Sequence, residues 1–251
     1  EINSIYKVGE NIVWVGGYAP FYWDGSVWSR PNSSSWPVFD SYGHCNAIWA
    51  SGPDDVFFVS DGGQINHWNG SNFERMETPT TSRLADIWGT GSDNVWAVGF
   101  DVSDGSTTLI HYNGSNWSLK YEGDEDDWYA RDENRLSGVI KSVFTHSGDL
   151  IYVLSNPNGV YTTLPNNSPG ATLQTIDQSW QGMRKIRGIH GNDLFICGNH
   201  SGIAHFNGAT VYRYPFRGEI DFYAIGVTNN LVVAVGPDLD NRGIAAVIGK
   251  R

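Results

Sequence analysis

The chain has 251 residues, 17% of them charged, with 30 glycines and 11 tryptophans. This composition suits tight turns between aromatic-rich strands and excludes an intrinsically disordered chain. The formal net charge of -11 disfavours nucleic acid and anionic membranes as partners, because like charges repel. No apolar run is long enough for a membrane-spanning helix, so we expect no membrane insertion.

A short apolar run recurs six times along the chain, and we anchor each copy on the residue that corresponds to Ile87. In chain order the anchors are Ile5, Ile48, Ile87, Val143, Ile189 and Ile225. An apolar residue stands three positions before each anchor and a small or short one directly before it. The copies follow one another at a period of roughly forty residues, which is typical of repeat architectures.

Three further runs follow each anchor in most copies, and turn residues separate them. The second run is aligned on Trp96, with Val13, Phe57, Ile151, Phe195 and Val233 in the other copies. The third run ends in a turn whose glycine supplies the positive φ of a tight hairpin, at Asp24-Gly25, Asn69-Gly70, Asn113-Gly114 and Asn207-Gly208. The fourth run opens at Trp28, Phe73, Trp117 and Val211. The sixth copy ends with its third run, at Ile244 to Lys250, so we expect its sheet to have three strands or to be completed by residues outside this chain.

Four short antiparallel strands per copy predict an all-β fold, a single six-bladed β-propeller domain over residues 1–251. Each sheet has two apolar faces, and a ring of six sheets lets every face pack on a neighbour. A Greek-key sandwich is the alternative, but it does not predict six copies of one register.

The segments Ile87-Trp88-Gly89 to Gly99 and Ile110 to Gly114 resemble the repeats of bacterial secreted β-propeller proteins, of the type IWGxGxxDVWAVG followed by IxHWxGxxW. The second and third copies match this pattern best. The resemblance implies an exported or cell-surface propeller with six or seven blades. It assigns no catalytic residues, because such repeats have no single activity. The Trp-Asp-Gly and Trp-Asn-Gly turns are also similar to those of propeller lectins.

Several clusters have the right chemistry for a site but are better explained as structure. His67, His111 and His205 occupy one column of the third run, yet equivalent positions on neighbouring blades lie on the order of 15 Å apart, too far to share a metal. The acidic run Asp124 to Asp127 could hold calcium, but its spacing is not that of a calcium-binding loop. We expect a solvated loop there, and no metal or cofactor in the chain.

The two cysteines, Cys45 and Cys197, stand in apolar columns of the second and fifth copies. A six-fold ring places these copies apart, beyond the ~7 Å that a disulfide allows. We therefore expect two buried free thiols.

The sequence shows no recognisable catalytic grouping, so we expect a binding module rather than an enzyme. Ser103-Asp104-Gly105 is the nearest approach to a sialidase box and departs from it on both sides. A secreted glycoside hydrolase or lyase stays open as the alternative, because catalytic groups on separate blades leave no local motif.

The long links between copies, at residues 30–44, 122–135 and 166–182, give the best indication of where a ligand binds. Strand alternation places them at the same end of the sheets as the turns between second and third strands. We predict a glycan or protein site there, because binding residues concentrate on loops held by a rigid scaffold. The candidate ligand-binding residues are Trp36, His44, Trp128, Tyr129, Arg131, Trp180 and Arg184.

Overall fold

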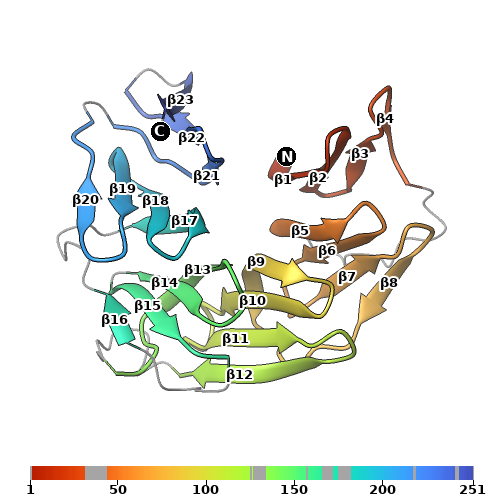
Figure 1. Ribbon diagram of the computed structural model, residues 1–251. Coiled ribbons are helices and arrows are strands. Elements are labelled where there is room, and N and C mark those ends of the chain that lie inside the picture. The colour runs from red at the N-terminus through yellow and green to blue at the C-terminus, as the bar shows by residue number, and fades with distance from the viewer. Residues whose placement is uncertain are drawn as a thin grey trace. The chain divides into compact units, whose positions relative to one another are not determined.

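A computed structural model describes residues 2–31, 44–124, 126, 134–156, 158–165, 172–174, 182–216, 219–240 and 243–250. The chain divides into two compact units, Glu1–Asp124 and Glu125–Arg251. Each predicted repeat forms one antiparallel sheet, and each unit contains three sheets (Figure 1). Within the described ranges, no helix is long and apolar enough to cross a membrane.

The first unit contains three four-stranded sheets in which consecutive strands are neighbours. The first sheet comprises β1 (Ile2–Val8), β2 (Ile12–Gly17), β3 (Phe21–Trp23) and β4 (Trp28–Ser29). The second comprises β5 (Ala47–Gly52), β6 (Asp55–Val59), β7 (Ile65–Trp68) and β8 (Phe73–Met76). The third comprises β9 (Arg83–Gly91), β10 (Asn94–Phe100), β11 (Thr107–Tyr112) and β12 (Trp117–Gly123).

The second unit contains two four-stranded sheets and one with three strands. The fourth sheet comprises β13 (Val139–Thr145), β14 (Ile151–Asn156), β15 (Gly159–Thr163) and β16 (Thr172–Gln174). The fifth comprises β17 (Met183–His190), β18 (Asp193–Gly198), β19 (Gly202–Phe206) and β20 (Val211–Arg213). The sixth comprises β21 (Ala224–Val227), β22 (Leu231–Asp238) and β23 (Gly243–Lys250). Within the described residues the sixth sheet thus has the three strands that the sequence predicts.

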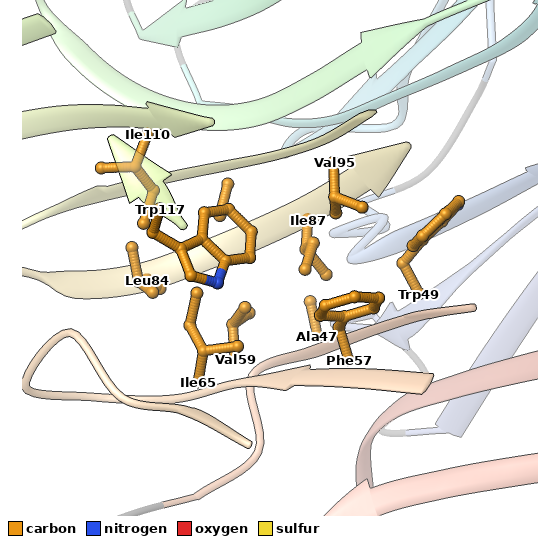
Figure 2. Packing of buried hydrophobic residues seen from close by; sticks show 11 residues of the cluster. Ala47, Trp49, Phe57, Val59, Ile65, Leu84, Ile87, Val95, Ile110 and Trp117 are labelled. Carbon is orange, nitrogen blue, oxygen red and sulfur yellow. The ribbon is translucent and has the colours of Figure 1, made fainter. Parts of the chain in front are cut away.

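The core of the first unit lies between its sheets. Figure 2 shows the layer between the second and third sheets, where Trp49 and Phe57 face Ile87, Val95 and their neighbours. Because each inner sheet packs on both sides, its strands carry almost continuous apolar runs instead of strict alternation. The burial pattern iBBBBBi of β10 shows this directly.

The predicted hairpins between third and fourth strands are Asx turns. Gly70 has φ of 88°, as the sequence predicts, while the preceding Asn69 accepts hydrogen bonds at its side-chain Oδ1 from the backbone N–H groups of Ser71 and Asn72, at 3.1 and 2.9 Å. Asp24, Asn113 and Asn207 accept equivalent pairs of bonds. The acidic or amide residue therefore caps the turn, and only its glycine adopts the left-handed conformation.

The register predicted from sequence is wrong in the first and fourth copies by one residue. Val15 pairs with Ile5 as Ala97 pairs with Ile87, so Trp14, and not Val13, corresponds to Trp96. Likewise Val153 pairs with Val143, and Tyr152 replaces Ile151. A slip of one residue moves a side chain to the opposite face of the sheet, and the correct register places the large aromatic side chains in one column.

The fifth anchor is wrong by three residues, because Ile186 and not Ile189 pairs with Ile196 as Ile87 pairs with Ala97. With this correction nine positions separate the anchor from the Trp96-type residue in each of the first five copies, for example Ile186 to Phe195. The link predicted at residues 166–182 is also shorter than expected, since it contains β16 (Thr172–Gln174). The predicted cysteine state is confirmed: Cys45 and Cys197 are free and buried.

Candidate functional site

We use the term loop face for the end of each sheet that carries the turn between second and third strands and the link to the next sheet. Of the seven predicted binding residues on it, only His44 and Arg184 fall within the described part of the chain. The other five, whose surroundings the structure does not describe, are Trp36, Trp128, Tyr129, Arg131 and Trp180.

In the first unit, His44 precedes β5 and contacts the turn between β2 and β3. Its ring centroid lies 3.9 Å from that of Tyr18, with 58° between the ring planes. The carbonyl of His44 accepts a hydrogen bond of 2.7 Å from the Ser60 hydroxyl, which fixes the backbone at the entrance to β5. The buried Nδ1 atom of His44 has no hydrogen-bond partner among the described residues, while Tyr18 is 67% exposed. An exposed tyrosine ring is therefore held beside an imidazole in which one nitrogen is not hydrogen-bonded to any described residue.

A second polar cluster of the first unit joins the second and third sheets at the loop face. Asn46 donates from Nδ2 to Asp61 Oδ1 at 2.8 Å and to the Leu84 carbonyl at 2.9 Å. Arg83 donates to Asn46 Oδ1 at 3.2 Å and forms an ion pair of 3.3 Å with Asp61. Because the Arg83 and Asp61 side chains are 52% and 36% exposed, this network adds little to stability. It fixes the geometry of the adjoining loops.

In the second unit, the guanidinium of Arg184 lies over the ring of Tyr223. Its guanidinium carbon is 4.2 Å from the centroid of the Tyr223 ring, and its Nε donates to Asn199 Oδ1 at 2.5 Å. The cation–π contact and the hydrogen bond to Asn199 together hold the planar guanidinium in one orientation. Since Tyr223 is 52% exposed, the pair presents a rigid aromatic surface and a fork of N–H donors.

The turn between β18 and β19 lies beside this pair and has an unusual backbone. His200 and Ser201 have φ of 55° and 54°, the two positive values among the described non-glycine residues. Such conformations cost free energy and persist where the surroundings impose them. The exposed His200 Nδ1 lies 3.1 Å from Glu219 Oε2, and the Ser201 hydroxyl accepts a bond of 3.1 Å from the Ile220 N–H.

The histidines of the third strands bond and pack within their own sheets. His67 and His205 donate from Nε2 to Asp55 and Asp193 at 2.6 and 2.9 Å, and burial lowers the pKa of His205. Each ring also packs on an aromatic side chain of its own sheet. Within the described residues no three metal-binding side chains come together.

Sequence reasoning missed Asn199, Tyr223 and the Asn46 network. Asn199 could not be recognised, because its role depends on a contact with Arg184, fifteen residues earlier in the chain. Tyr223 could have been found, since it directly follows Phe222, the apolar residue three positions before the sixth anchor.

No family model matches the chain, and no curated protein matches it. Solved structures do resemble it. YCF48 from Cyanidioschyzon merolae is 14% identical with a TM-score of 0.67, covering 98% of this chain and 84% of YCF48. A structure of YCF48 bound to D1 peptide is 16% identical with a TM-score of 0.66, covering 98% of this chain and 76% of that one.

The extracellular domain of the one-component system BT4673 from B. thetaiotaomicron is 13% identical with a TM-score of 0.69. The match covers 100% of this chain but only 35% of that domain, so the chain spans about a third of its length. At these identities the likeness concerns the fold alone. These neighbours are propeller proteins, and the six antiparallel sheets accordingly form a six-bladed β-propeller.

Proposed function

We propose that this chain is a non-catalytic binding module that recognises an extended segment of a partner protein through its loop face. The observation that carries the proposal is the pair Arg184–Tyr223, in which an exposed aromatic ring supports an oriented guanidinium. Tyrosine and arginine are the residue types most enriched at binding hot spots. Because Asn199 already orders the Arg184 side chain, binding would cost less conformational entropy.

The chemistry of the pair favours a carboxylate next to an apolar or aromatic group. A guanidinium presents parallel N–H donors that match a carboxylate. An acidic side chain or a chain terminus offers this group, and a neighbouring apolar side chain of the same segment would cover Tyr223. The structure of YCF48 bound to D1 peptide supports the choice of a peptide, because that protein shares the fold.

We further propose that the protein acts outside the cytoplasm, in keeping with its resemblance to secreted propeller repeats. The likeness to extracellular domains of bacterial proteins supports this localisation. The competing ligand class is a glycan, bound through the aromatic side chains of the loop face. The competing activity is that of a glycoside hydrolase or lyase.

One screen separates these functions. The purified chain is tested in parallel against a random peptide display library, a glycan array and a panel of chromogenic glycoside and polyuronide substrates. We expect enrichment of peptides that carry a carboxylate beside an apolar residue, with no turnover of any substrate. Selective glycan binding, or turnover that survives repurification, would contradict the proposal.

A further inference from the structure

Two exposed histidines from neighbouring sheets of the second unit meet at the end opposite to the loop face. His146 directly follows β13, and His190 is the last residue of β17. The Nδ1 atom of His190 lies 3.2 Å from the Nε2 atom of His146, and the ring centroids are 4.5 Å apart with 78° between the planes. We propose that this pair is a binding site for a divalent late transition-metal ion such as Zn²⁺, Ni²⁺ or Cu²⁺.

The separation of the two nitrogens fits a shared metal ion. Zinc binds imidazole nitrogen at about 2.0–2.1 Å in a tetrahedral arrangement, which places two ligand nitrogens roughly 3.3 Å apart. The observed 3.2 Å is close to this value, and both rings are exposed, so they can turn to direct their lone pairs at one point. In the absence of metal, one ring donates an N–H to the other.

The backbone on the His146 side is held in place. In the turn after His146, the Thr145 hydroxyl donates to the Leu150 carbonyl and accepts from the Gly148 N–H, both at 2.9 Å. These two bonds close the turn between β13 and β14 from within. The position of His146 is therefore fixed by its own hairpin.

The His190 side is attached to the fourth sheet. The hydroxyl of Tyr152, on β14, donates to the Gly191 carbonyl at 3.2 Å. Three residues before His190 on β17, Arg187 donates from Nη1 to the Val143 carbonyl at 3.2 Å. The relative position of the two histidines is thus set by the packing of the two sheets, so binding requires little reorganisation.

The chemistry of the pair selects the class of ion. Neutral imidazole suits zinc, copper and nickel, whereas magnesium and calcium prefer oxygen ligands. The described residues supply no third metal-binding side chain, so water or a partner's side chain would complete the coordination. The formal charge of -11 raises the local concentration of cations.

The remaining described histidines lack this arrangement. His67 and His205 are bonded to aspartates and packed on aromatic rings. His111 stacks on Trp96, and the ring of His44 packs against that of Tyr18. His200, which is exposed beside Glu219, is the most stringent control. A single histidine next to a carboxylate could also bind a metal weakly.

The test is isothermal titration of Zn²⁺, and separately Ni²⁺, into the chain without a histidine tag at pH 7.5, where an ordinary imidazole is neutral. The proteins compared are wild type and the variants His146→Gln, His190→Gln and His200→Gln. We expect one ion bound per chain by wild type and by His200→Gln. Each of the other two variants should lose affinity by about tenfold or more, because each removes one of two protein ligands.

Thermal melting provides a second readout. Saturating Zn²⁺ should raise Tm of the wild type, because the ion binds only the folded arrangement, and EDTA should reverse the rise. Without metal, the two pair variants should melt like the wild type, since both side chains are exposed. Absence of binding by the wild type, or binding by His146→Gln and His190→Gln as tight as that of the wild type, would overturn the proposal.

Discussion

The ring of His111 stacks on the indole of Trp96, with centroids 4.2 Å apart and 30° between the planes. Both side chains bond to one acceptor, Oδ1 of Asn94, from Nε2 of His111 at 2.9 Å and from Nε1 of Trp96 at 3.0 Å. Asp55 and Asp193 occupy the corresponding position in the second and fifth sheets. The histidine of the third sheet is therefore bonded to a neutral amide, whereas those of the second and fifth sheets are bonded to a carboxylate.

This difference leads to a prediction about pH. Burial, followed by the charge of Lys120, lowers the pKa of His111 from 6.5 to about 4. Because the unfolded state takes up the proton first, the contribution of His111 to stability is complete above pH 6.5 and is lost as the pH falls toward 4. Allowing for solvent screening, we expect a loss on the order of 1 kcal/mol.

The matched variant is Asn94→Asp, which should raise the pKa of His111 by placing a carboxylate at its Nε2. NMR titration of the His111 ring reports the pKa, and urea unfolding at pH 7 and 4.5 reports stability. Asn94→Asp should lose less stability than the wild type between these two pH values. A wild-type His111 that titrates near 6.5 would refute the account.

A second prediction concerns the serine that joins adjacent sheets. The buried Ser142 hydroxyl accepts hydrogen bonds from the backbone N–H of Ile186 at 3.2 Å and from Arg187 at 3.3 Å. Ser142→Ala leaves a buried donor unsatisfied and should lower the free energy of unfolding by about 1–3 kcal/mol. The control Ser118→Ala, at a half-buried hydroxyl, should cost less than about 1 kcal/mol. Equal costs in chemical denaturation would show that the bond to the neighbouring sheet is unimportant.

Close packing around Gly16 supports a third prediction. A Cβ atom built on Gly16 would lie 2.4 Å from Cys45 Sγ and 2.9 Å from Cys45 Cβ. Gly16→Ala should therefore destabilise the protein by about 1–3 kcal/mol, whereas Gly226→Ala, with no atom within 4 Å, should not suffer this clash. Combining Gly16→Ala with Cys45→Ala should cost less than the sum of the two single changes. Strict additivity in the double-mutant cycle would contradict the predicted contact.

The state of the thiols gives a fourth prediction. Cys45 and Cys197 are both fully buried, and burial raises the pKa of each thiol, to about 12 for Cys197. Since the thiolate is the reactive form, neither should react with a thiol reagent in the folded protein. Two thiols should react in denaturant without reductant. Rapid labelling of the native protein would show that the sheets open more readily than their packing implies.

The sequence predicts the number of sheets and the three-stranded sixth sheet because turns and apolar runs are local signals. It predicts register less well. Val13 and Trp14 are both apolar, and only pairing with the first strand decides which of them corresponds to Trp96. The anchor Ile189 fails for a similar reason. Ile186 and Ile189 are the same residue type on one strand, and only pairing with β18 shows that Ile186 is the anchor.

The loop face was predictable in position but not in detail. Strand alternation predicts which end carries the long links, and Arg184 does lie there. Its orientation depends on Asn199 and Tyr223, which come from the neighbouring loops and share no sequence pattern with it. The organisation as a single domain and the roles of Trp36, Trp128, Tyr129, Arg131 and Trp180 remain predictions.

The most direct test of the binding function is the effect of loop-face variants on the affinity for a selected peptide. Arg184→Ala and Tyr223→Ala should each weaken binding by about 1–2 kcal/mol, and we expect the same of Trp128→Ala and Arg131→Ala. Tyr212→Ala is the matched control, because Tyr212 is 58% exposed on the outer strand β20 and should leave affinity unchanged. For every variant, Tm should stay close to that of the control. Unaltered affinity in the four loop-face variants, or a loss that merely follows a fall in Tm, would contradict the central claim.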